Sequence, residues 1–274
     1  WAFRGITFMR IANALHLVVL VLQASLCAPS QVRADCPQWL AGQPVAGVNG
    51  YVAAMTLWDP DGEGPEPTLL VVGGNFSVAG DAAANCVAAW DGHTWRGFGA
   101  GITDNSIPPS ILALAVYNGQ LYAGGRFSTP SGLANLARWN GTAWVSAGGD
   151  YVTGKVSSLC LHQGELIAGG EFDKFGNTTA RCLAAFDGVS WREYGGGVTH
   201  SPALPRVNSL VSAGDTLYAG GRFTRAGGTS VSNIAAWRDG SWHTMAFGVV
   251  LKSGGDVVSQ MLAIADELFV AGPI

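Results

Sequence analysis

The chain has 274 residues, with 15 Lys and Arg against 19 Asp and Glu, so its formal net charge is −4. This balance gives no basic surface for nucleic acid and no acidic tail, and we therefore expect no nucleic-acid partner. Charged residues make up only 12% of the chain while glycine fills 39 positions, which favours an all-β protein with many tight turns. A chain of this length can bury a core large enough to fold without a metal or a disulfide.

The N-terminal segment has the pattern of a secretory signal peptide. Met9-Arg10 precedes an apolar run over residues 11–28, and a small-residue cleavage pattern ends at Ala34. The alternative is a membrane anchor, but polar residues interrupt the run and no basic stop-transfer flank follows it. We predict residues 1–34 as a signal peptide, of which residues 1–8 precede a credible start methionine and need not be translated. The mature chain is then secreted, at the cell surface or periplasmic, with no stable membrane insertion.

Four segments of the remaining chain repeat one phrase of apolar residues, a glycine pair and a phenylalanine. They read LVVGGNF, LYAGGRF, LIAGGEF and LYAGGRF and begin at Leu70, Leu121, Leu166 and Leu217. The second glycines of the pairs lie 51, 45 and 51 residues apart, and a degenerate copy, LFVAGPI, places Gly272 another 51 residues on. Self-similarity at this period indicates a solenoid or a propeller.

Within one period the sequence predicts four antiparallel strands. Residues 111–116 alternate and end in an Asn-Gly hairpin turn, and residues 121–127 form the second strand. Residues 136–139 form the third strand, and a second Asn-Gly turn leads into the fourth, which carries Trp144. Four antiparallel strands per period of this length are typical of a β-propeller blade.

The glycine pair, an aromatic in the third strand and a tryptophan in the fourth resemble the pattern of kelch repeats. The residues that carry this resemblance are Gly73, Gly74, Trp90 and Trp95; Gly124, Gly125, Trp139 and Trp144; Gly169, Gly170, Phe186 and Trp191; and Gly220, Gly221, Trp237 and Trp242. The phenylalanine after each pair is a variant similar to propeller repeats of secreted bacterial proteins and fungal cell-polarity cortical markers. The resemblance implies a kelch-like β-propeller over residues 35–274, with four full blades near 52–99, 111–148, 156–195 and 207–246.

Partial blades are expected at both ends of this region. Trp39 matches a fourth-strand tryptophan, and residues 257–271 supply a first and a second strand. A closed ring needs a third strand between them, and kelch-type rings usually have six or seven blades. We therefore expect the chain to be an incomplete ring.

The repeated glycines have a structural interpretation. Without a Cβ atom they allow close approach of backbones or a positive φ, while the aromatic residues fill the wedge between blades. Cys86 and Cys182 occupy equivalent third-strand positions two blades apart, which Asn135 and Asn233 fill in the other blades. We therefore predict no Cys86–Cys182 disulfide, because the two positions are too far apart.

The search for chemistry gives few candidates. Asp59, Asp61 and Glu63 alternate in a loop and are weak calcium candidates, the alternative being a solvated acidic turn. The five histidines are scattered, and no nucleophile, zinc or phosphate-binding motif occurs. We predict no catalytic residue, no metal and no cofactor.

Function is expected in the loops that join the second and third strands and in the loops between blades, which share one face in propellers. The polar residues selected there as ligand-binding candidates are Asp104, Lys174, Arg181, His200, Arg225 and Lys252. The prediction is a secreted interaction module that binds an extracellular protein or glycan. The alternative is a carbohydrate-active enzyme of the galactose-oxidase or glycosidase type.

Overall fold

The computed structural model describes residues 6–11, 47–103, 109–129, 131–148, 151–245, 258–264 and 267–273. The regular secondary structure in these ranges consists of strands. The described residues therefore include no apolar helix that could span a membrane. Four antiparallel sheets of four strands each follow one another along the chain. The predicted all-β class with four-stranded antiparallel sheets is therefore confirmed.

We call these four sheets units 1 to 4, and each keeps its strands in chain order from the inner to the outer edge. Their strands are, in unit 1, β2 (Tyr51–Trp58), β3 (Leu69–Asn75), β6 (Val87–Trp90) and β7 (Trp95–Gly97); in unit 2, β8 (Ser110–Tyr117), β9 (Gln120–Ser128), β10 (Ala134–Trp139) and β11 (Trp144–Val145); in unit 3, β12 (Val156–His162), β13 (Glu165–Gly170), β16 (Leu183–Phe186) and β17 (Trp191–Glu193); and in unit 4, β19 (Arg206–Ala213), β20 (Thr216–Arg222), β23 (Ile234–Arg238) and β24 (Ser241–Thr244).

In three units, the segment between the second and third strands contains two short strands that pair with each other. They are β4 (Val78–Ala79) with β5 (Ala82–Ala83), β14 (Lys174–Phe175) with β15 (Thr178–Thr179), and β21 (Arg225–Ala226) with β22 (Thr229–Ser230). A further strand, β18 (Val198–Thr199), joins the last pair to the loop between units 3 and 4.

A fifth sheet contains a pairing that the sequence did not suggest. Its strands β25 (Gln260–Ile264) and β26 (Glu267–Pro273) are the first and second strands expected there, and β1 (Ile6–Ile11) pairs antiparallel with β26. β1 thus takes the place that the third strand has in units 1 to 4. No third strand was expected in this sheet, and residues 6–11 supply one, because the free edge of β26 offers unpaired backbone groups to an extended segment. The incomplete ring stays a prediction. The signal-peptide prediction for residues 1–34 stays a prediction, and Trp39 lies outside the described residues.

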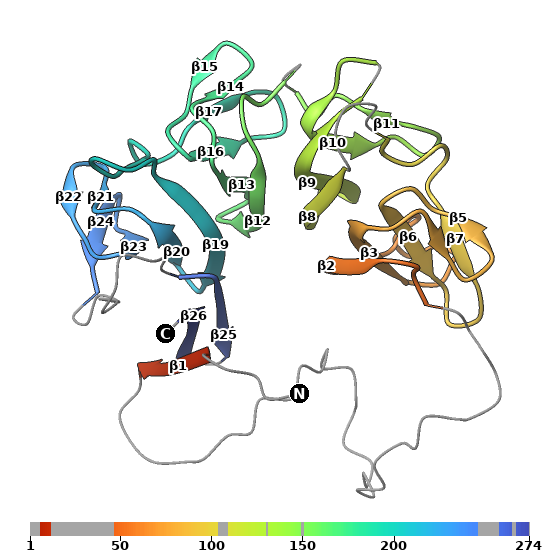
Figure 1. The fold of residues 1–274 in the computed structure, drawn as a ribbon, viewed down its shortest axis with the longest axis horizontal. Coiled ribbons are helices and arrows are strands. Elements are labelled where there is room, and N and C mark those ends of the chain that lie inside the picture. The colour runs from red at the N-terminus through yellow and green to blue at the C-terminus, as the bar shows by residue number, and fades with distance from the viewer. Residues whose placement is uncertain are drawn as a thin grey trace, which may run out of the picture.

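The units stand side by side around an arc, with their first strands innermost (Figure 1). Strand β8 contacts both β2 and β12, and β19 contacts both β12 and β25. The largest apolar clusters lie between units rather than inside them. One joins units 1 and 2, the next units 2 and 3, and the third units 3 and 4.

The glycine pairs explain how the units come so close. A Cβ on the first glycine of each pair would lie 2.5–2.7 Å from a methyl group of a β-branched residue at the start of the next sheet. For Gly124 this residue is Val156. A Cβ on the second glycine would overlap a carbonyl oxygen of its own unit, as Gly125 does with that of Ser110. At this point each first strand has a register shift, in unit 2 between Ile111 and Ala113. Close approach is therefore the reason for the pairs, and the alternative of a positive φ is wrong, since none of the eight glycines has one.

The equivalent positions Cys86, Asn135, Cys182 and Asn233 share a left-handed backbone, with φ of 72°, 66°, 64° and 65°. In units 1 to 3 this side chain donates to a carbonyl of the loop that leads to the next unit. The Cys86 thiol donates to the Pro109 carbonyl at 3.6 Å, Asn135 Nδ2 to the Val152 carbonyl at 2.8 Å, and the Cys182 thiol to the Pro205 carbonyl at 3.5 Å. Cys86 and Cys182 are free thiols in different units. Burial raises the pKa of the Cys182 thiol to about 12, which keeps it protonated as a donor.

Candidate functional site

A cavity with a volume of about 500 Å³ lies between units 1 and 2. That volume falls in the range of small-molecule sites. Its walls come from the β2–β3 loop, strand β7, the β8–β9 turn and the β10–β11 turn. The lining residues are Trp58, Pro60, Glu66, Arg96, Gly97, Phe98, Gly119, Gln120, Trp139, Asn140 and Gly141.

Three aromatic rings form the apolar part of the cavity. The ring centroid of Phe98 lies 5.8 Å from that of Trp58 and 5.2 Å from that of Trp139, the latter pair edge to face. Trp58 Nε1 donates to the Gly119 carbonyl at 2.9 Å, which ties unit 1 to unit 2 at the cavity. The rings are each less than a tenth exposed, so their positions are fixed by packing.

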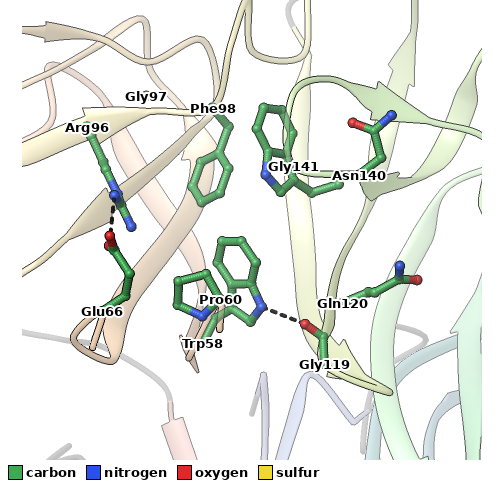
Figure 2. A pocket seen from close by; sticks show the side chains of 11 residues that line it. Trp58, Pro60, Glu66, Arg96, Gly97, Phe98, Gly119, Gln120, Asn140 and Gly141 are labelled. Atoms are coloured by element: carbon green, nitrogen blue, oxygen red, sulfur yellow. Dashed lines mark hydrogen bonds and ion pairs between the residues drawn. The ribbon is translucent and has the colours of Figure 1, made fainter. Parts of the chain in front are cut away.

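Polar groups lie on two sides of these rings (Figure 2). On one side Arg96 Nη1 and Glu66 Oε2 form an ion pair at 3.9 Å, with about half of each side chain exposed. On the other side are the amides of Gln120 and Asn140. Gln120 Oε1 accepts from Arg138 Nη1 at 2.8 Å, and Asn140 Oδ1 accepts from the backbone of its own turn. The Nδ2 donor of Asn140 has no partner in the part of the chain that the structure describes.

The loop that carries Glu66 is organised by the residues considered for calcium. Asp61 Oδ2 accepts from the Glu66 backbone N–H at 3.1 Å, and Asp59 Oδ1 from that of Asp61 at 3.3 Å. Both acids thus satisfy backbone donors of a turn, as short polar side chains commonly do. Over the described ranges, no group of three His, Cys, Asp or Glu side chains is placed to hold a metal ion.

A second cavity of about 340 Å³ opens on the opposite face of unit 1. Its polar lining includes Asn49, Asn75, Ser77 and Asn85, and it reaches the buried Cys86. Asn49 Oδ1 accepts from the backbone N–H groups of Ser77 and Val78 at 2.9 and 3.0 Å, so this amide already holds the chain.

Of the ligand-binding candidates selected from the sequence, the four that the structure describes, Lys174, Arg181, His200 and Arg225, line neither cavity. His200 and Arg225 are brought together, because Thr199 pairs with Arg225 in the small β18–β21 sheet. Arg181 forms an ion pair with Glu193 at 3.7 Å, and Lys174 is an exposed residue of β14. Asp104 and Lys252 lie outside the described residues.

Sequence patterns did not predict the residues of the first cavity, because the candidates were chosen from the loops between the second and third strands and between units. The signal was present: residues 58–67 read WDPDGEGPEP where the other units have a two-residue hairpin turn. A loop that departs from a repeated frame is the expected place for function.

No protein-family model matches this chain, and no curated protein matches it. Solved structures resemble it distantly, among them the following two. The computationally designed Ika8 protein has a TM-score of 0.44 and 12% identity, over 83% of this chain and 60% of its own. The structure of YjhT has a TM-score of 0.45 and 13% identity, over 79% of this chain and 70% of its own. The chain thus spans less than two thirds of the designed protein.

A buried histidine between units 3 and 4 predicts a pH-dependent stability. His162 is 2% exposed; its Nδ1 lies 2.8 Å from Ser212 Oγ, and its Nε2 is buried with no partner among the described residues. Burial lowers the pKa of His162, against the opposing charges of Asp215 and Glu165. An unfolded histidine titrates near about pH 6.5. The unfolded chain therefore takes up the proton first, and stability falls as the pH drops below that value.

We expect the free energy of unfolding, measured with urea, to decrease between neutral pH and pH about 5, with part of the decrease absent in His162→Gln. His93→Gln, at an exposed turn, is the matched control and should keep the full decrease. An unchanged pH dependence in His162→Gln would show that another group is responsible.

Proposed function

We propose that the four units are blades of a kelch-like β-propeller and that the chain is an exported carbohydrate-binding module. The proposed ligand is a neutral saccharide bound in the cavity between units 1 and 2. Four-stranded antiparallel sheets placed side by side around an arc support the propeller assignment (Figure 1). Export is proposed from the N-terminal sequence pattern alone.

The observation that carries the binding proposal is the combination of groups in this cavity. Trp58, Phe98 and Trp139 offer apolar surface, while Gln120, Asn140 and the Glu66–Arg96 pair offer donors and acceptors at its sides. A pyranose ring has the same two characters, with apolar C–H faces and hydroxyl groups around its edge. Apolar walls with a few placed polar groups are the usual composition of a ligand site.

Binding is favoured over glycoside hydrolysis by the acids of the cavity. Its lining includes one carboxylate, Glu66, and that carboxylate is paired with Arg96. Hydrolysis normally requires two carboxyl groups on either side of the scissile bond. An enzymatic function would therefore need a further group brought to the cavity by the substrate or by another part of the protein.

The test is a screen of the purified protein on a glycan array, followed by calorimetric titration of the best neutral glycan. We expect Arg96→Gln to weaken binding about tenfold or more, because a charge-assisted hydrogen bond contributes about 1.5–3 kcal/mol. Arg192→Gln is the matched control, since Arg192 follows the fourth-strand tryptophan of unit 3 as Arg96 does in unit 1. That variant should bind as the unmodified protein does.

Two outcomes would contradict the proposal. Equal binding by the unmodified protein and Arg96→Gln would remove the ligand from this cavity. Release of reducing sugar or of hydrogen peroxide from the bound glycan would favour the enzyme alternative.

A further inference from the structure

The second cavity combines an apolar floor with a polar rim. Its volume of about 340 Å³ lies in the range of small-molecule sites. The most buried lining residues, which form the floor, are Phe76, Cys86 and Ile102, at 6%, 3% and 0% exposed. The rim includes the exposed residues Ser77 and Thr103. None of the described residues that line this cavity carries a charge.

Two half-buried asparagines of the lining have amide groups whose orientation is fixed by their partners. Asn75 Nδ2 donates to the Pro109 carbonyl at 2.7 Å, and Asn85 Nδ2 donates to the Ala100 carbonyl at 2.8 Å. A backbone carbonyl can only accept, so each amide must turn its nitrogen toward the carbonyl. Neither Oδ1 atom has a hydrogen-bond partner in the described part of the chain. The cavity therefore has two unused acceptors.

The other polar side chains of the lining do not provide a matching surplus of donors. Asn49 Nδ2 donates to Ser77 Oγ at 2.9 Å, and its Oδ1 accepts from the backbone. The Cys86 thiol donates to the Pro109 carbonyl at 3.6 Å, and burial raises its pKa, so the thiol stays neutral. The hydroxyl groups of Ser77 and Thr103 can donate or accept. A ligand that brings donors therefore fits better than one that brings acceptors.

The repeated frame does not explain the two asparagines. The position of Asn75, directly after the glycine pair, holds arginine or glutamate in units 2 to 4. The position of Asn85 holds alanine, arginine and serine in those units. Unit 1 alone of the four units thus has an amide at both positions. A departure from a repeated frame is the expected place for function.

We propose that the second cavity is a binding site for a primary ammonium group carried on an apolar stem. An ammonium group brings three N–H donors and no acceptor, which matches the free Oδ1 atoms of Asn75 and Asn85. A hydroxyl group fits less well, because it brings a single donor. The stem covers the apolar floor, while the exposed rim leaves the charged group partly hydrated and so limits the cost of its desolvation. The site uses none of the residues of the first cavity and does not depend on the function proposed for it.

The test is calorimetric titration of the full chain with pentylamine, pentanol and pentyltrimethylammonium. Pentanol has one donor and no charge, and the quaternary ion keeps the charge without any N–H donor. We expect pentylamine to bind about tenfold more tightly than either, because hydrogen bonds to charged groups are stronger than neutral ones. A lysine side chain has the same chemistry, so Nα-acetyllysine amide is titrated as well, and tighter binding of it would make a peptide the source of the ammonium group.

Variants of one asparagine locate the ligand. Asn85→Ala introduces the residue that unit 2 has at this position and should weaken pentylamine binding about fivefold or more. Asn208→Ala is the matched control, since Asn208 Nδ2 donates to the Val258 carbonyl at 2.9 Å but does not line the cavity. That variant should bind normally. Asn85→Ser, with the residue of unit 4, takes the place of Asn85→Ala if the alanine variant does not fold.

The free thiol of Cys86 gives a second measurement at the cavity itself. Cys182, the equivalent buried thiol of unit 3, is an internal control in the same molecule. Saturating pentylamine should slow the alkylation of Cys86 by iodoacetamide relative to that of Cys182, because the ligand covers the floor of the second cavity.

Three results would overturn the proposal. The first is equal affinity for the amine, the alcohol and the quaternary ion, and the second is unchanged pentylamine binding in a folded Asn85 variant. The third is a ratio of the two alkylation rates that pentylamine does not change. Arg96→Gln, which tests the first cavity, should leave pentylamine binding intact, so failure at one site is distinguishable from failure at the other.

Discussion

Replacing Gly125 with alanine is expected to destabilise the protein by about 3 kcal/mol, at the upper end of the range for overpacking a core. The added Cβ would overlap the carbonyl oxygen of Ser110 and approach the Cα atom of Ile111 to 3.0 Å. These are backbone atoms of the neighbouring strand, so no side-chain rotation can relieve the overlap. The strand itself must move, and it packs against the next unit. The free energy of unfolding from denaturant titration measures the effect.

Two further glycines make this prediction specific. Gly124→Ala should cost less, because its Cβ meets a methyl group of Val156 at 2.6 Å, and a side chain can shift more easily than a backbone. Gly47→Ala should be nearly neutral, since nothing lies within 4 Å of its Cβ and its φ is not positive. If all three variants lose similar stability, the close contacts are not the cause of the loss, since the effect of Gly→Ala on the unfolded chain is stabilising.

The sequence predicted the fold class because the determinants are local and repeated. Hairpin turns, alternating apolar residues and the glycine pairs recur at the same spacing, and the observed sheets match the expected ranges to within a few residues. The choice between close approach and positive φ at the glycines needed the structure, since both demand a missing Cβ. The pairing of β1 with β26 joins residues at opposite ends of the chain, and no local pattern announces such a partner.

The candidate sites were harder to predict, for a physical reason. The first cavity forms where the β2–β3 loop of one unit meets two turns of the next, and sequence patterns do not give the distance between them. Glu66 and Arg96 are 30 residues apart and look like separate surface charges in the sequence.

The left-handed position shared by Asn135 and Asn233 shows how one side chain can join two units. Asn135 Oδ1 accepts from the Phe127 backbone N–H at 3.0 Å, and its Nδ2 donates to the Val152 carbonyl in the loop leading to unit 3. Asparagine also tolerates a positive φ better than most residues. Cysteine and asparagine alternate at this position, so it tolerates more than one residue type. The structure gives that tolerance a limit, since both residues provide a hydrogen-bond donor.

Asn135→Ala is therefore expected to destabilise the protein by about 2–3 kcal/mol. It leaves the Phe127 N–H and the Val152 carbonyl without this partner and places a residue with no local hydrogen bond at φ 66°. Asn135→Cys should recover part of the loss, because in unit 3 the Cys182 thiol donates to the Pro205 carbonyl from the equivalent position. Denaturant unfolding of the two variants ranks them, and equal losses would mean that the donor to the inter-unit loop contributes nothing. A loss confined to Asn135→Ala would show that this contact with the inter-unit loop stabilises the packing of unit 2 on unit 3.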